Sequence, residues 1–147
     1  MKFSAILSSA AVAAAAVINK RDVQWSVSDF AAGCIPHSTQ CSVGFNVLQP
    51  NSMETTGVKC DVRVASIPGA GGPSMIPNIS GAKCSNSSRT FDLFRGVEGL
   101  TLTVSQQVSQ LSFRTGSHVL PSDDFKLTYE PNAWVESYTG ASSFDLE

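Results

Sequence analysis

Apolar residues recur at every second position in several short stretches of the chain. Leu100, Leu102 and Val104, for example, alternate with threonine and serine. Because successive side chains of a strand point to opposite faces, each such stretch predicts a β-strand with one buried face. Eight stretches have this pattern: residues 23–28, 40–48, 58–65, 89–94, 100–105, 110–114, 125–129 and 134–139.

The stretches are separated by turn-forming residues, which predicts an all-β, single-domain fold: an antiparallel β-sandwich or β-barrel of about eight strands. One helical turn is expected at most, near residues 104–110. Residues 67–80 are rich in Gly and Pro and predict the longest loop. The alternation assigns four apolar side chains near the ends of the later stretches to buried faces, namely Leu111, Phe113, Leu127 and Tyr129.

Two of the stretches predict a hairpin. Residues 40–48 and 58–65 flank a segment, 49–57, that contains proline, asparagine and glycine. Alternation on both sides is consistent with a register in which Val47 faces Val58.

That register limits how the four cysteines can pair. Cys41 and Cys60 would lie about four residues apart along the strands, at roughly 3.4 Å per residue, beyond the limit of about 7 Å between the Cα atoms of a disulfide. Of the remaining pairings we expect Cys34–Cys41 and Cys60–Cys84, because both close locally around turn-rich segments. An even count favours disulfides in an oxidising compartment. A zinc site would need closer pairs such as C-x₂-C, so we expect no metal and no cofactor.

The first residues predict export from the cell. Lys2 precedes an apolar run, residues 3–17, that ends in small side chains. This pattern is typical of a signal peptide, here residues 1–16, with cleavage near Ala14 or Ala16. A membrane-spanning helix needs about 20 predominantly apolar residues, more than this alanine-rich run contains.

A short pro-segment, residues 17–21, is expected to follow the signal. It ends in Lys20 and Arg21, a dibasic pair that resembles the processing site of Golgi subtilisin-like proteases. The secreted β domain would then comprise residues 22–147 and begin at Asp22.

Charge narrows the possible partners. Three of the ten basic residues lie within the first 21 residues and all twelve acidic residues lie beyond them, which leaves the secreted domain with a net charge of −5. Its lysines and arginines are scattered singly. A nucleic-acid partner is therefore not expected, because phosphate backbones attract clustered positive charge.

Two sequons are candidates for N-glycosylation. Asn78 and Asn86 each begin an Asn-x-Ser triplet in a stretch rich in Gly, Pro and Ser. Such a stretch is expected at the surface, where the modification occurs in secreted proteins.

Residues for catalysis are few. His37 precedes Ser38 and His118 follows Ser117, but triads are built from residues that are distant in the chain, and no Gly-x-Ser-x-Gly motif is present. We therefore expect no catalytic residue and no enzymatic activity.

Acidic residues and glycines do not change that expectation. Asp123, Asp124, Glu130 and Glu136 could in principle flank a glycosidic bond. The two aspartates follow Pro-Ser and are typical of a turn instead. The glycines of residues 69–72 lack the Lys-Ser/Thr that a phosphate-binding loop requires.

Aromatic residues offer an alternative in which the protein binds sugars. Trp25, Trp134 and Tyr138 could form a platform for a sugar ring. However, Trp25 lies between Val23 and Val27 on the face expected to be buried, so it is assigned to the core. Trp134 lies at a loop-to-strand boundary, where partial exposure and burial are both open.

One segment is similar to a known group of proteins. A W-x-V-x-x-F strand at residues 25–30 is followed by the C-x₆-C pair Cys34 and Cys41, a C-x-x-x-F strand ending at Phe45, and a C-x-V strand at residues 60–62. This arrangement resembles small secreted fungal proteins that induce the hypersensitive response in plants. More distantly, it resembles the β-barrel family of the Alternaria major allergen, from which the cysteine spacing departs.

The resemblance implies a secreted fungal effector or elicitor, non-catalytic, that acts in the host apoplast. Its partner would be a plant cell-surface or apoplastic protein, and no binding residues follow from the resemblance. The alternative is a small carbohydrate-binding or cell-wall-associated module whose partner is a cell-wall glycan. Neither reading includes a membrane span or a cofactor.

Overall fold

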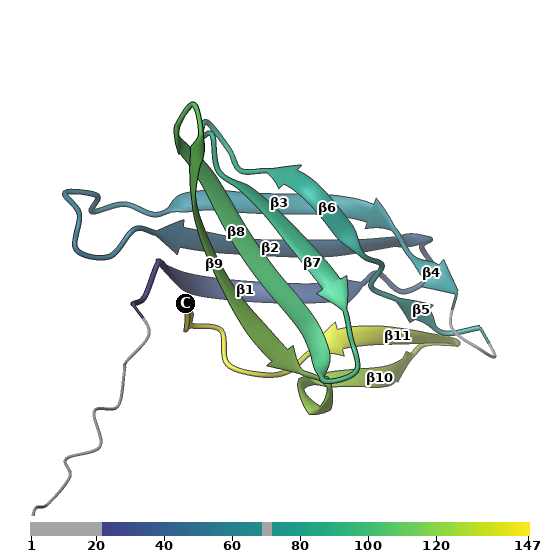
Figure 1. Cartoon of the computed structure of the whole chain (residues 1–147). Helices are drawn as coiled ribbons and strands as arrows, with labels where there is room; N and C mark the ends of the chain where they lie inside the picture. The colour runs from purple at the N-terminus through teal and green to yellow at the C-terminus, as the bar shows by residue number, and fades with distance from the viewer. Residues whose placement is uncertain (1–21, 69–71) are drawn as a thin grey trace, which may run out of the picture.

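The computed structural model describes residues 22–68 and 72–147. The predicted signal peptide, the pro-segment and the Lys20-Arg21 site lie outside these residues. The described part forms twelve strands and one short 3₁₀ helix, arranged as two packed sheets (Figure 1), so the all-β prediction is confirmed.

The larger sheet contains eight strands: β1 (Trp25–Cys34), β2 (Gln40–Leu48), β3 (Val58–Ala65), β4 (Ile67–Pro68), β5 (Ser74–Met75), β10 (Phe125–Glu130), β11 (Ala133–Tyr138) and β12 (Phe144–Leu146). The smaller sheet contains four: β6 (Ile79–Lys83), β7 (Thr90–Arg95), β8 (Gly99–Ser109) and β9 (Ser112–Pro121). The 3₁₀ helix, η1 (Ser122–Asp124), leads from β9 into β10.

Strand order in the larger sheet is β3-β2-β1-β11-β5-β4, with β10 paired to β11 and β12 paired to β1. The smaller sheet is ordered β6-β7-β8-β9. All pairs are antiparallel except β11 with β5, which is parallel. Ser117 of β9 and Glu147 exchange two main-chain hydrogen bonds, which tie the smaller sheet to the end of β12 and give a half-barrel.

The core lies between the two inner faces. Trp25 is fully buried, as predicted. Phe45 of β2 meets Phe91 of β7 edge to face, with ring centroids 5.0 Å apart. Aromatic pairs of this geometry are more favourable than their buried area alone, and this one joins the two sheets at the centre of the core.

The predicted hairpin register and both predicted disulfides are confirmed. Val47 faces Val58 in the β2–β3 pair. Cys34 and Cys41 lie opposite each other on β1 and β2 and form one bond, while Cys60 of β3 bonds to Cys84, just after β6. The second disulfide therefore links an edge of the larger sheet to an edge of the smaller one.

Several predicted boundaries were wrong. The helical turn that the sequence left possible near residues 104–110 does not form, because β8 extends to Ser109 and is paired with β9, with a register shift between Gln107 and Ser109. The stretch predicted as 110–114 begins in the turn between β8 and β9 and ends inside β9, which runs from Ser112 to Pro121. Residues 67–80, expected as a loop, contain the start of β6 and also β4 and β5, which are too short to show alternation.

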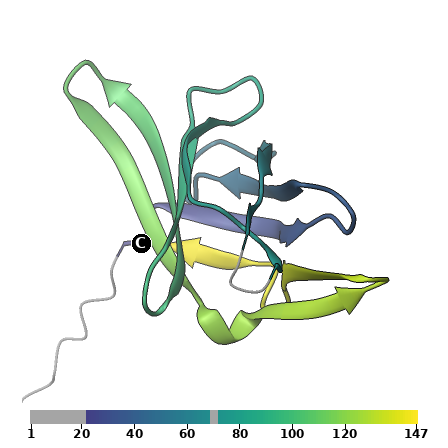
Figure 2. The ribbon, with the colours of Figure 1, turned by 90° about the vertical axis from the view of Figure 1, so that its right-hand side faces the viewer.

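Two side chains assigned to a buried face are exposed. Leu111 is 96% and Phe113 63% accessible. Both belong to the hairpin of β8 and β9, which extends beyond the larger sheet (Figures 1 and 2). Alternation fixes which residues share a face, but a face is buried only where another layer covers it.

Candidate recognition surface

The two histidines lie apart from any catalytic arrangement. His37 is exposed in the turn between β1 and β2, and His118 of β9 stacks on Phe144 with ring centroids 4.7 Å apart. Ser117, although next to His118 in sequence, points to the opposite face and bonds to the hydroxyl of Thr103 at 2.8 Å.

A hollow of about 340 Å³ is lined by Ser117, His118, Val119 and Glu147. It has the residue types of a triad, but within the described chain no hydrogen bond joins these side chains to one another. Glu147 reaches Ser117 through its main chain only. The hollow therefore lacks the chain of contacts from nucleophile to base to orienting acid that such catalysis needs.

The candidate carboxylates are likewise separated. Asp123 and Asp124 form the 3₁₀ turn, and Glu130 ends β10 on the outer face of the sheet. Glu136 lies on the inner face and is buried. Glu130 and Glu136 thus point away from each other and do not flank a common space. Across the described ranges, no three His, Cys, Asp or Glu side chains are grouped to hold a metal ion.

Glu136 joins the two sheets. Its carboxylate accepts hydrogen bonds from both terminal nitrogens of Arg95, which ends β7, and from the main-chain N–H of Ile76 at 3.0 Å. Arg95 also donates to the carbonyl of Ile76 at 2.9 Å. The Glu136 side chain is only 5% exposed, so this acid is committed to a buried, bidentate ion pair.

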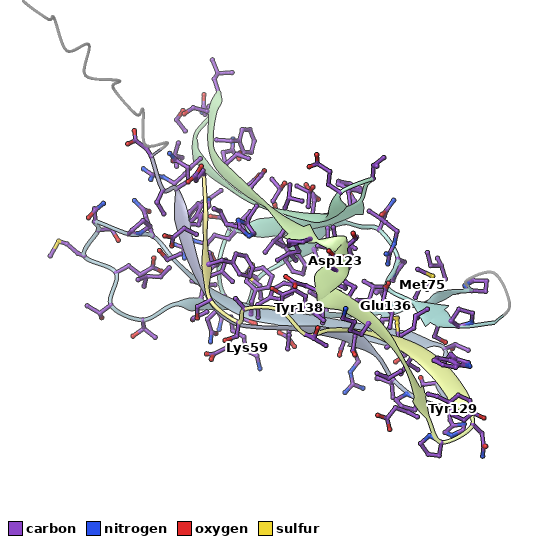
Figure 3. The ribbon with its side chains drawn as sticks, turned by 90° about the horizontal axis from the view of Figure 1, so that it is seen from below. Lys59, Met75, Asp123, Tyr129, Glu136 and Tyr138 are labelled. Atoms are coloured by element: carbon purple, nitrogen blue, oxygen red, sulfur yellow. A yellow bond between two sulfur atoms is a disulfide. The ribbon has the colours of Figure 1, made fainter. Side chains whose placement is uncertain are left out.

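Beyond this ion pair, the inner face of the larger sheet continues without cover. We call this region the apolar patch and define it by Ile67, Met75, Leu127, Tyr129 and Trp134. Leu127, Tyr129 and Trp134 are 47%, 58% and 51% exposed, and Ile67 is 42% exposed. In Figure 3, Tyr129 lies toward the tip of the β10–β11 hairpin, beyond Glu136 and Tyr138.

Register explains how the patch is assembled. Leu127 lies opposite Glu136, and Tyr129 lies opposite Trp134, in the β10–β11 pair. The rings of Tyr129 and Trp134 are 5.3 Å apart and inclined at 52°. Met75 is on the adjoining strand β5 and pairs with Ile67 of β4, which continues the row on the same face.

Leu127 and Tyr129 were predicted to be buried, and this prediction was wrong. Both share a face with Phe125, which packs against the core, so the alternation itself is correct. The smaller sheet, however, ends with Arg95 on β7, and β10 and β11 continue past it. Nothing in the sequence of β10 marks where its inner face becomes uncovered, because the covering sheet ends at Arg95, about 30 residues earlier in the chain.

The three-aromatic platform does not form. Trp25 is in the core with the Arg89 guanidinium 4.6 Å from its ring centre. Tyr138 packs edge to face on Phe30 and donates its hydroxyl proton to the carbonyl of Ala141. Burial, and then the nearby Asp124 carboxylate, raise the pKa of Tyr138. Trp134 is exposed, and its aromatic partner is Tyr129.

A second ion pair, between Arg89 and Glu54, lies at the edge of the core next to the loop between β2 and β3. Arg89 is nearly buried and donates to both oxygens of Glu54, to the carbonyl of Val47 and to Gln106. The hydrogen bonds from Arg89 hold the pKa of Glu54 below its usual value, against the opposing effect of burial. These contacts fix the loop between β2 and β3 to the residue that precedes β7.

Both sequon asparagines are at the surface. Asn86 is exposed in the turn before β7, with a φ of 50°. Asn78 is exposed just before β6, and its side-chain oxygen accepts a hydrogen bond from the Arg95 N–H at 2.8 Å.

Comparison with protein-family models and with curated proteins finds no match to this chain. In the part of the chain that the structure describes, no helix is long and apolar enough to cross a membrane.

Proposed function

We propose that this chain is a secreted fungal effector or elicitor that acts without catalysis. In this proposal, its apolar patch is the surface that a plant cell-surface or apoplastic protein recognises. The observation that carries the proposal is the exposed row of Leu127, Tyr129 and Trp134 on the β10–β11 hairpin. Contiguous exposed apolar patches on small proteins commonly mark interaction sites.

The chemistry of the patch supports a protein partner. Tyrosine and tryptophan are enriched among the residues that contribute most to protein–protein affinity. Tyr129 and Trp134 contact each other across two paired strands, so little side-chain freedom remains to be lost on binding. The Arg95–Glu136 pair holds the base of this hairpin to the smaller sheet.

The disulfides support an extracellular role. Cys34–Cys41 and Cys60–Cys84 account for all the cysteines of the chain, and such bonds persist in oxidising compartments. A domain of this size gains a useful part of its stability from such cross-links.

The experiment is infiltration of leaves with the purified chain that begins at Asp22. Replacing Tyr129 and Trp134 together by alanine should raise the dose needed for a defence response at least tenfold. Leu111→Ala with Phe113→Ala is the matched control, because it also removes two exposed apolar side chains from a hairpin, at the opposite end of the molecule. It should leave the response unchanged.

Catalysis is tested in the same assay. His37→Ala and His118→Ala should each leave the response near wild type. Far-UV circular dichroism and the thermal midpoint are measured for every variant. A histidine variant that keeps its fold and loses the response would overturn the non-catalytic proposal, and an unaffected Tyr129/Trp134 variant would remove the patch from it.

A second candidate is a carbohydrate-binding or cell-wall-associated module. The observation that favours it is the inclined Tyr129–Trp134 pair, which presents exposed ring faces on which a sugar ring can stack. Co-sedimentation with insoluble fungal and plant cell-wall glycans distinguishes the two. Binding that is lost in Trp134→Ala would favour the glycan, and no binding would leave the protein partner.

A further inference from the structure

The outer edge of β10 presents main-chain groups that point away from the sheet. The Thr139 N–H donates to the Asp124 carbonyl, which fixes the parity of the β10–β11 ladder. Phe125, Leu127 and Tyr129 therefore occupy the positions that are not hydrogen-bonded to β11. Their N–H and C=O groups are directed toward the open edge.

Within residues 22–68 and 72–147, no main-chain partner occupies the Leu127 and Tyr129 positions of this edge. Other edges are closed at least in part: the Cys60–Cys84 disulfide and its bridge join β3 to the β6 region, and Glu147 pairs with β9. Figures 1 and 2 both show β10 at the lower margin of the molecule. An uncovered strand edge is a template for pairing with another chain.

We propose that a second copy of this chain pairs with the first along β10, antiparallel and with two-fold symmetry, so that Thr128 lies opposite Thr128 of the partner subunit. In this register the N–H and C=O of Leu127 bond to those of Tyr129 of the partner subunit. The symmetric bonds form from Tyr129, which gives four main-chain hydrogen bonds in all.

Charge favours this register. It places Lys126 opposite Glu130 of the partner subunit, and the symmetry makes the same pair twice on the outer face. Both side chains are exposed in the single chain. Opposite charges directly across two strands are stabilising and like charges are destabilising. A register centred on Leu127 would instead bring Glu130 opposite Asp124 of the partner subunit.

The ends of the paired segment also fit. The next hydrogen-bonded position would pair Phe125 with Pro131 of the partner subunit. The Phe125 N–H is already bonded to the Ser122 carbonyl, and proline has no N–H. Pairing can therefore stop at this point without leaving a donor unsatisfied. A register centred on Tyr129 would place the proline opposite Leu127, whose C=O would then lack a donor.

The side chains of the inner face agree with this register. Leu127 and Tyr129 are about half exposed in the single chain. In the dimer, Leu127 of each copy lies opposite Tyr129 of the partner subunit. Aromatic and aliphatic side chains at such positions stabilise a pair of strands. The two apolar patches become one continuous surface, which remains open on the inner face.

Sedimentation of the chain that begins at Asp22, with its disulfides formed, tests the proposal over a range of concentrations. We expect a monomer–dimer equilibrium. Lys126→Glu and Glu130→Lys should each raise the dissociation constant at least tenfold, because each places like charges opposite one another twice. The two substitutions combined should restore it to within about threefold of wild type, since opposite charges face each other again.

The matched controls are Lys83→Glu and Glu98→Lys, the same charge changes at exposed positions on the smaller sheet and its β7–β8 loop. They should leave the dissociation constant within about twofold of wild type. A chain that stays monomeric at every concentration would overturn the proposal. So would a dimer that is insensitive to Lys126→Glu, or one that the combined substitution does not restore.

Cross-linking tests the register directly. Thr128→Cys should form an intersubunit disulfide on mild oxidation, because the position lies opposite itself. Lys126→Cys is the control from the same strand: its two copies would be about four residues apart, roughly 14 Å, which is too far for a disulfide. Equal cross-linking of both variants would refute the register. Neither readout uses the leaf response, so the dimer and the proposed function stand or fall separately.

Discussion

The inter-sheet ion pair should be the polar contact whose loss most destabilises the fold. Glu136→Ala removes a carboxylate that accepts three hydrogen bonds, two from Arg95 and one from the Ile76 N–H. Arg95 is left facing an empty site, and its own side chain is 29% exposed, so water can rehydrate part of it.

The expected magnitudes follow from burial. Breaking a buried ion pair costs about 3–5 kcal/mol. Glu136→Ala should lie near the lower limit, about 3 kcal/mol, because the orphaned guanidinium is partly hydrated. Arg95→Ala should cost about 4 kcal/mol, since the carboxylate that it leaves behind is almost completely buried.

Removing both charges should cost less than the sum of the two losses. In Arg95→Ala with Glu136→Ala no charge is buried, and the remaining cost is the lost partners of the Ile76 N–H and C=O, about 1–3 kcal/mol each. We expect a total of about 3 kcal/mol, against about 7 kcal/mol for additive effects.

Urea unfolding followed by tryptophan fluorescence measures each free energy of unfolding. Differential scanning calorimetry should show about 4 °C of lowered midpoint per kcal/mol for a domain of this size. Glu98→Ala, an exposed glutamate in the β7–β8 loop, is the control and should cost less than about 0.5 kcal/mol. A cost below about 1 kcal/mol for Glu136→Ala, or additive losses in the double variant, would refute the reasoning.

Three further predictions concern the disulfides, the acid response and the sequons. In the chain-entropy model, loops of 8 and 25 residues contribute about 2.5 and 3.5 kcal/mol, so Cys60→Ser should lower the urea midpoint more than Cys34→Ser, and the reverse order would contradict the model. The pKa of Glu54 is lowered from 4.5 in the folded state, so its contribution to stability is complete above pH 4.5 and is lost as the pH falls through the lower folded pKa. The difference in thermal midpoint between wild type and Glu54→Gln should therefore narrow below pH 4.5 and stay constant above it. Asn78→Gln and Asn86→Gln should each remove one endoglycosidase-sensitive mass shift from the secreted protein, and an unchanged mass would exclude that site.

Local alternation was sufficient to predict the elements that depend on neighbouring strands. Val47 opposite Val58 fixed the relation of Cys41 to Cys60, and that distance excluded the wrong disulfide. Trp25 was assigned to the core because its neighbours at alternate positions are apolar. In each case a contact between sequence neighbours, or across one hairpin, determined the result.

The features that sequence reasoning missed depend on contacts between the sheets. β4, β5 and β12 contain two or three residues each, too few to show a period of two. Arg95 and Glu136 are 41 residues apart, and neither has a local pattern that marks it as buried. Their pairing follows from how the two sheets cross, which no stretch of the chain encodes by itself.

The apolar patch depends on the same long-range geometry. Its surroundings explain why the exposed β10–β11 hairpin does not promote indiscriminate pairing with other strands. Tyr129, Leu127 and Phe125 have one periodicity, yet only Phe125 packs against the core. Glu136 lies on the same face, between Phe125 and the exposed side chains, and Arg95 neutralises its charge. The exposed row is therefore bordered by an ion pair and is not covered by a second apolar layer. Lys126 and Glu130 occupy the opposite face, and charges on an edge strand oppose indiscriminate pairing because only a register that matches them is favourable. A hairpin built in this way remains selective: it leaves aromatic surface open to a partner while restricting which strand can join its edge.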